Sequence, residues 1–174
     1  MATKLLFVLR HAKSSWDDPS TPDQERPLAP RGRRAVTMLR EHLEASEIQP
    51  ALVLCSSARR TRETLEGVNP AGERLIEPEL YGADAGELLG RLRRVGEGVP
   101  SVMLIGHNPA LQVLILRLAE APGPAAEESD LDRVRRKLPT GALATLEFEC
   151  EWNELGPRKA RLTGLVRPKQ LLER

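Results

Sequence analysis

Continuous apolar runs alternate with amphipathic segments along the first two thirds of the chain. Three runs are typical of strands buried on both faces, because consecutive apolar residues end at polar or small ones: residues 4–9, 50–57 and 101–105. Apolar residues at helical spacing follow, over residues 30–46, 58–68, 84–98 and 107–120. Residues 74–82 are expected to hold a short strand and a turn. Buried strands that alternate with helices predict an α/β fold with a largely parallel sheet.

The last third of the chain has a different pattern. Residues 121–139 are polar and flanked by prolines, which predicts a loop with one or two helical turns. Residues 141–152 and 159–168 alternate apolar and polar positions, and the gap between them suits a hairpin. We therefore expect one doubly wound α/β domain over residues 1–174. Its mostly parallel sheet is flanked by helices, with an antiparallel edge and no large cap.

A long irregular segment separates the first expected strand from the first expected helix. Residues 14–32 carry four prolines and little periodicity, which predicts a loop of about twenty residues. Structureless loops of that length are uncommon in compact domains and usually have a function. We expect this loop to be functional.

Composition and charge exclude several classes of protein. The 174 residues can bury a proper core, and 26 basic against 25 acidic residues give no general attraction to nucleic acids or anionic membranes. The apolar stretch Leu5–Leu9 is too short for a signal peptide or a membrane span. Cys55 and Cys150 lie far apart, as expected of two reduced thiols. We expect a cytoplasmic protein that binds neither nucleic acid nor membrane.

Polar and cationic residues follow three of the expected strands. Arg10 and His11 follow the first strand, and His107 and Asn108 follow the strand at residues 101–105. The strand at residues 50–57 ends in Ser56 and Ser57 and is followed by Arg59, Arg60 and Arg62. Ligands of open α/β sheets bind beyond the carboxyl ends of the strands. If the three strands are neighbours, two histidines and at least two arginines converge on one pocket.

Each of these features also has an ordinary structural explanation. A lone histidine after a strand is usually a hydrogen-bonded loop residue, and SSARRTR alone is typical of the solvated first turn of a helix. The run Arg31–Arg34 is interpreted as surface charge or a weak anion contact, and His42 is given no role. Two of the three histidines nevertheless occupy equivalent strand ends, which favours a shared site. No Gly-rich phosphate loop, cysteine pair or zinc motif competes with this interpretation.

Four segments in order carry a family resemblance: LRHAKSSWDD, RPLAPRG, LCSSARRTRET and LIGHNPAL. With them the chain resembles the histidine phosphatase (phosphoglycerate mutase-like) superfamily and, within it, the small SixA-like phosphohistidine phosphatases. The resemblance extends from Lys4 to about Leu118. An Arg-His pair alone is a weak signal, whereas the ordered set with a second histidine is a strong one. Ala12 stands where the family usually has glycine, as in this small branch.

The resemblance implies a role for each of four side chains. His11 would be the nucleophile, a neutral imidazole that accepts the phosphoryl group and passes it to water. Arg10, Arg60 and His107 would bind the phosphoryl oxygens and neutralise their charge. Arg59 is the neighbour that an alignment shifted by one residue would choose instead of Arg60. No cluster of residues has metal-ligand spacing, and the cationic side chains already supply positive charge, so we expect neither a metal nor a cofactor.

The acid that protonates the leaving group is less clearly marked. In larger relatives it is a carboxylate in the segment after the second helix, where this chain offers Glu77, Glu79, Asp84 and Glu87. Glu79, beside LYG, is our prediction, while surface solvation is the alternative for all four.

Three functions are compatible with these residues. The chain is expected to be a phosphatase that works through a phosphohistidine intermediate, with phosphohistidine on a protein as its substrate and inorganic phosphate as its product. A phosphatase for a small phosphorylated metabolite, or a non-catalytic phosphoryl-binding module, are the alternatives. The intact set Arg10, His11, Arg60 and His107 disfavours the module. The segment before residue 101 leaves little sequence for a lid, which favours a bulky substrate.

Overall fold

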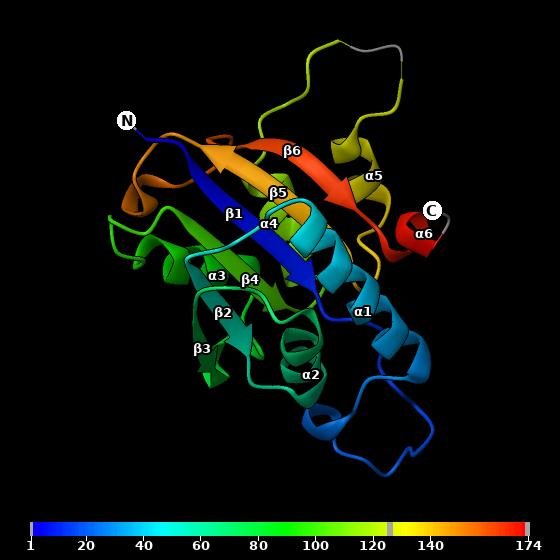
Figure 1. Cartoon of the computed structure of the whole chain (residues 1–174). Helices are drawn as coiled ribbons and strands as arrows, with labels where there is room; N and C mark the ends of the chain where they lie inside the picture. The colour runs from blue at the N-terminus through cyan, green and yellow to red at the C-terminus, as the bar shows by residue number, and fades with distance from the viewer. Residues whose placement is uncertain (1, 125–126, 173–174) are drawn as a thin grey trace.

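A single six-stranded sheet organises the molecule (Figure 1). The computed structural model describes residues 2–124 and 127–172; the predicted domain boundaries also take in residues 1, 125–126 and 173–174, which lie outside the described residues. The strands are β1 Lys4–Arg10, β2 Leu52–Ser56, β3 Glu73–Glu77, β4 Ser101–Gly106, β5 Leu143–Phe148 and β6 Arg161–Val166. Their order in the sheet is β3-β2-β4-β1-β5-β6.

The sheet is parallel on one side and antiparallel on the other. β3, β2, β4 and β1 run parallel to one another, whereas β5 pairs antiparallel with β1 and β6 antiparallel with β5. The expected α/β fold with an antiparallel edge is confirmed. The expected neighbourhood of the three polar-ended strands is also confirmed, because β4 lies between β1 and β2.

Helices cover both faces of the sheet (Figure 1). The longer helices are α1 Pro30–Ala45, α2 Arg59–Val68, α3 Ala85–Arg93 and α4 Ala110–Leu118, and the shorter ones are α5 Asp130–Arg136 and α6 Pro168–Leu172. One core cluster holds apolar side chains of α1, α2 and α6, and the other holds those of α3, α4 and α5. No helix within the described residues is long and apolar enough to cross a membrane.

Alternation along the strands explains why two cores form. Leu6 and Val8 of β1 belong to one cluster, while Phe7 and Leu9 belong to the other. Successive side chains of a strand point to opposite faces, so an unbroken apolar run feeds both cores. This is why KLLFVL is continuous rather than alternating.

The irregular segments differ from expectation in three details. The loop after β1 contains a 3-10 turn at Asp23–Glu25 and an isolated bridge between Ser14 and Leu28. The gap between β5 and β6 holds another 3-10 turn, Trp152–Glu154, so the two strands are joined by more than a tight hairpin. Helix α6 had no sequence prediction, because five residues are too few to show helical periodicity.

Candidate active site

The two histidines lie side by side because their strands pair in register. Arg10, the last residue of β1, is opposite Gly106, the last residue of β4, and each is followed directly by a histidine. The backbone N–H of His11 donates to the carbonyl of Gly106 at 3.1 Å, which extends the pairing by one step. The imidazole rings of His11 and His107 consequently have centroids 5.4 Å apart.

The His11 ring is buried and has a defined orientation. Its Nδ1 lies 2.7 Å from the carbonyl oxygen of Ala12, a group that only accepts hydrogen bonds. The proton of the neutral ring is therefore on Nδ1, and Nε2 carries the lone pair. The backbone N–H of Ala12 donates in turn to Oγ1 of Thr64 on α2, which fixes the turn that holds the ring. This tautomer suits attack by Nε2.

Burial keeps both histidines neutral near pH 7. It lowers the pKa of His11 to about 3, with added repulsion from His107, Arg60 and Arg10, although the bond to Ala12 acts in the opposite direction. Burial likewise lowers the pKa of His107 to about 4, and the positive charge of Arg60 contributes. A buried imidazole beside cations is disfavoured as a cation. Both rings are therefore neutral at physiological pH.

His107 is held from two sides. Its Nε2 lies 2.7 Å from Oγ of Ser56, at the carboxyl end of β2, and the Ser56 oxygen also accepts from the backbone N–H of Ala58. The ring of Tyr81 meets His107 edge-on, with centroids 5.6 Å apart. Nδ1 of His107 is buried and has no protein hydrogen-bond partner among the described residues. The hydrogen-bonding capacity of this atom is therefore unused within the described part of the protein.

Asp23 links the long loop to the site. Its carboxylate accepts from Nη2 of Arg60 at 3.0 Å, and its backbone carbonyl accepts from Nη1 of the same guanidinium at 2.7 Å. The hydroxyl of Tyr81 and the guanidinium of Arg26 donate to the same carboxylate. These bonds, the one from Tyr81 above all, lower the pKa of Asp23 to about 2. Asp23 is thus an ionised anchor for Arg60 and Tyr81.

Arg10 is oriented by the loop that precedes β5. Its Nη1 donates to the carbonyl of Leu138 at 2.9 Å, and its Nε is buried with no hydrogen-bond partner among the described residues. Nε of Arg60 is likewise buried with no hydrogen-bond partner among the described residues. Burial and the charge of Arg60 lower the pKa of Arg10. Two guanidinium groups with unused donors thus lie beside two neutral imidazoles, an arrangement whose chemistry suits an oxyanion.

The RPLAPRG segment holds the loop against the turn after His11. The backbone N–H of Ala29 donates to the carbonyl of Lys13, and that of Leu28 donates to the carboxylate of Glu63 on α2. A Cβ on Gly32 would lie 2.2 Å from the Lys13 carbonyl oxygen, so only glycine allows α1 to start so close to this turn. The motif is therefore part of the architecture of the site.

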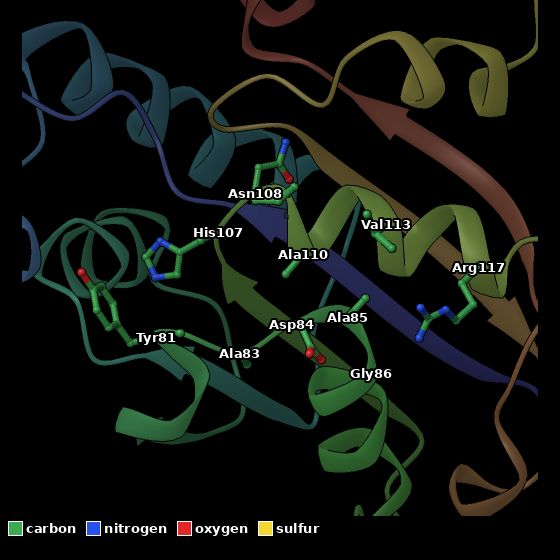
Figure 2. Close-up of a pocket in the computed structure, with 12 residues that line it drawn as sticks. Tyr81, Ala83, Asp84, Ala85, Gly86, His107, Asn108, Ala110, Val113 and Arg117 are labelled. Atoms are coloured by element: carbon green, nitrogen blue, oxygen red, sulfur yellow. The ribbon is translucent and has the colours of Figure 1, made fainter.

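An open cavity of about 610 Å³ begins at His107. Figure 2 shows His107 and Tyr81 at one end and Arg117 of α4 at the other, with Ala83 and Ala110 between them. A phosphoryl group near His107 would thus have room for its leaving group along this cavity.

The four carboxylates considered for the acid have different surroundings. Glu77 forms an ion pair with Arg91 at 2.7 Å, and Asp84 and Glu87 form the capping box at the start of α3. Glu79 is exposed and lines a different cavity together with Glu77 and Arg91. Of the four, Asp84 lines the cavity that includes His107. The role of Glu79 as the acid stays a prediction.

Two residues of the site were not selected from the sequence. Asp23 lies in the proline-rich loop, and Tyr81 lies in LYG beside the predicted acid. The signal for Asp23 was indirect, since it precedes the RPLAPRG segment by three residues. Tyr81 is the only tyrosine of the chain, but a single aromatic residue has no periodicity to interpret. Sequence reasoning places Ser56 at the strand end but gives it no role.

Comparison with known proteins shows the family of this chain. The family model described as "Histidine phosphatase superfamily (branch 1)" matches residues 6–100, more than half of the chain. The chain belongs to the histidine phosphatase superfamily. As a member it is a hydrolase that removes phosphoryl groups from phosphorylated substrates.

Two relatives cover most of this histidine phosphatase. The uncharacterized protein Rv1276c of Mycobacterium tuberculosis is 34% identical over 161 residues, which cover 92% of this chain and 100% of that one. The phosphohistidine phosphatase SixA of Escherichia coli is 30% identical over 125 residues, 68% of this chain and 76% of that one.

Solved structures share its fold. A structure from Nakamurella multipartitia that carries the name phosphohistidine phosphatase SixA has a TM-score of 0.85 and 26% identity, and covers 97% of this chain and 98% of that one. The α-ribazole phosphatase of Shigella flexneri, at 16% identity, has a TM-score of 0.68 and covers 94% of this chain and 96% of that one. The second likeness shows the fold alone.

The neutral state of the histidines can be tested by titration. A lowered histidine pKa means that the proton binds only when the pH falls well below the ordinary value of about 6.5. We expect the ¹⁵N shifts of His11 and His107 to report neutral rings from pH 8 down to about pH 5, with the His11 proton on Nδ1. Protonation of either ring above about pH 6 would contradict the described burial.

The alignment of the second arginine can be tested by a matched pair of variants. The Arg60 side chain is 7% exposed and faces the site, whereas that of Arg59 is 47% exposed and pairs with Glu63. We expect Arg60→Ala to lower kcat/KM on p-nitrophenyl phosphate by about 10² to 10³, as for the loss of one oxyanion donor. Arg59→Ala serves as the control and should change kcat/KM less than about threefold. Equal losses in both variants would refute the assignment of Arg60.

Proposed function

We propose that this histidine phosphatase hydrolyses phosphohistidine on proteins, with His11 as the nucleophile and with Arg10, Arg60 and His107 as the phosphoryl-binding groups. The observation that carries the proposal is the buried, neutral His11, whose Nδ1 bonds to the Ala12 carbonyl and leaves Nε2 free. A neutral nitrogen with a fixed direction is what in-line attack on phosphorus requires.

The reaction has two displacement steps. In the first, a bond forms between Nε2 of His11 and phosphorus, while the phosphorus–nitrogen bond of the substrate breaks and its electron pair leaves with the substrate imidazole, which takes a proton from solvent. In the second, a water oxygen attacks phosphorus, the bond to His11 breaks and the water proton is released, so that inorganic phosphate is the product. Arg10 and Arg60 balance the charge on the equatorial oxygens in both steps.

The choice of substrate follows from the carboxylates around the site. Asp23 is ionised by its bonds to Tyr81 and Arg60 and cannot serve as a proton donor near pH 7. An alkyl phosphate ester needs an acid because its alkoxide must be protonated as it leaves. Imidazole is a good leaving group once it is protonated by solvent or hydrogen-bonded. The site therefore favours a phosphoryl group on nitrogen over one on an alkyl oxygen.

A small-molecule phosphatase is the second candidate. The observation in its favour is Asp84, whose carboxylate borders the same cavity as His107 and would be the acid for an alkyl ester. That carboxylate already accepts the backbone N–H of Glu87 at 2.8 Å and is occupied in capping the start of α3. A cytoplasmic location is part of our main proposal, since both cysteines are free thiols.

A substrate panel separates the two candidates. We expect kcat/KM to be highest for a protein that carries phosphohistidine, intermediate for p-nitrophenyl phosphate and lowest for sugar phosphates and phosphoglycerate. His11→Ala should abolish turnover of every substrate, because no phosphoenzyme can form. A clearly higher kcat/KM for an alkyl phosphate would favour the small-molecule phosphatase, and loss of that activity in Asp84→Asn would then identify the acid.

Metal independence is a further expectation. Arg10 and Arg60 supply the positive charge that magnesium provides in other phosphoryl-transfer sites. We expect the rate on p-nitrophenyl phosphate to be unchanged after dialysis against EDTA. A loss that returns on addition of a divalent ion, but not of a monovalent salt at equal ionic strength, would contradict this mechanism.

A further inference from the structure

A strongly basic cavity lies apart from the cavity at His107. Its volume is about 440 Å³, and it shares no lining residue with the other. Five of its ten lining residues are basic and none is acidic: Lys13, Arg31, Lys137, Arg167 and Lys169. These five, which we call the basic pocket, come from the loop after β1, from α1, from the loop before β5 and from the start of α6. Figure 1 shows α1, α6 and the chain after α5 at the same side of the sheet.

No carboxylate among the described residues balances the charges of the basic pocket. Among residues 2–124 and 127–172, none of the five cations has a carboxylate at ion-pair distance. The nearby Arg135 and Arg136, by contrast, pair with Asp132 and Glu128. Nε of Arg167 is also buried without a hydrogen-bond partner in the described part of the chain. The chain has nearly as many acidic as basic residues, so this imbalance is local.

The basic pocket is joined to the active site by shared backbone. Lys13 follows His11 by two residues. Leu138, between Lys137 and Pro139 of the pocket lining, accepts the hydrogen bond from Nη1 of Arg10. The N–H of Gly141 contacts the carbonyl oxygens of both Arg10 and His11. A molecule bound in this pocket would therefore lie next to the phosphoryl site.

We propose that the basic pocket docks an acidic segment of the phosphoprotein substrate, one whose Asp and Glu side chains flank the phosphorylated histidine. This inference rests on the proposed function and specifies which phosphoproteins the enzyme selects. Unpaired cations around an active site attract carboxylates and raise the rate of productive encounter. The pocket gives the enzyme a means of selecting a substrate by residues outside the phosphoryl group.

The side chains that line the basic pocket favour a polypeptide over other polyanions. Lys13, Arg31, Lys137 and Lys169 are exposed on long flexible side chains, which suit several separate carboxylates better than one compact anion. The other lining residues are Ala35, Pro139, Thr140, Pro168 and Leu172, so no aromatic ring is available for stacking a nucleic acid base. Leu172 offers an apolar contact to a neighbouring side chain of the partner.

Two phosphohistidine peptides of equal length test the proposal. In one, several Asp and Glu residues flank the phosphohistidine; in the other, Asn and Gln replace them. We expect the acidic peptide to have a KM about tenfold lower at low salt, with similar kcat, and the difference to shrink in about 0.5 M NaCl because salt screens exposed charges. Equal KM values for the two peptides at low salt would overturn the proposal.

A pair of double variants locates the effect. Arg167→Gln with Lys169→Gln removes two charges of the basic pocket, and Arg94→Gln with Lys159→Gln removes two exposed charges elsewhere. We expect the first variant to raise KM for the acidic peptide about three- to tenfold, with kcat/KM on p-nitrophenyl phosphate and on the neutral peptide unchanged. The second variant should leave all three unchanged. If both variants raised KM for the acidic peptide equally, the net charge of the protein would explain the preference. The assignment of the preference to the basic pocket would then be overturned.

Direct binding separates failure of this inference from failure of the proposed function. The unphosphorylated acidic peptide, labelled for fluorescence anisotropy, should bind the wild type and bind the Arg167→Gln/Lys169→Gln variant several-fold more weakly. If p-nitrophenyl phosphate is hydrolysed but neither phosphopeptide is, the proposed function is wrong. The anisotropy measurement would still show whether the basic pocket binds an acidic peptide. Tighter binding of a single-stranded RNA than of the acidic peptide would overturn the assignment of a polypeptide ligand.

Discussion

The parallel pairing of β1 with β4 determines where the candidate active site lies. Arg10 and Gly106 end the two strands at the same level, so the next residue of each chain segment is a histidine at the same edge of the sheet. The register is itself fixed by burial, since Leu6 and Val8 face one core while Phe7 and Leu9 face the other. A slip by one residue would turn each apolar side chain to the opposite face. The site is therefore positioned by the same alternation that builds the two cores.

The long loop after β1 supplies a negative charge to a site that is rich in cationic residues. Two arginines and two histidines at one edge repel one another, and burial adds to the cost of their positive charge. The two histidines remain neutral, and the positive charge of Arg60 is balanced by the carboxylate of Asp23. Arg26, which also bonds to Asp23, stacks its guanidinium over the ring of Trp16 at 3.5 Å. The proline-rich segment is thus held by specific contacts and carries the counter-charge for the site.

Sequence patterns predicted the parts of this structure that depend on periodicity. Buried strands, the four longer helices and the antiparallel edge all follow from apolar spacing, and the polar strand ends indicated the edge where the site lies. Asp23 could not be predicted in the same way, because its bond to Arg60 joins residues 37 positions apart through an irregular loop. The ion pair of Glu77 with Arg91 likewise depends on the fold, whereas the capping box of Asp84 and Glu87 follows from their local spacing at the start of α3. The surroundings of Glu77 and Glu79 are known only from the structure.

The chemistry proposed for the site is weakly selective by itself. In the proposed mechanism a neutral histidine and two arginines recognise little more than a phosphoryl group, and without a strong acid the substrate would be limited mainly by the quality of its leaving group. Several phosphoproteins would satisfy that condition equally well. Discrimination among them must then come from contacts outside the reacting atoms. The open cavity at His107 can accept the leaving group, while the basic pocket lies on the backbone that orients Arg10. Binding energy gained at the pocket would be available where the phosphoryl group is transferred, which connects the choice of partner to the reaction.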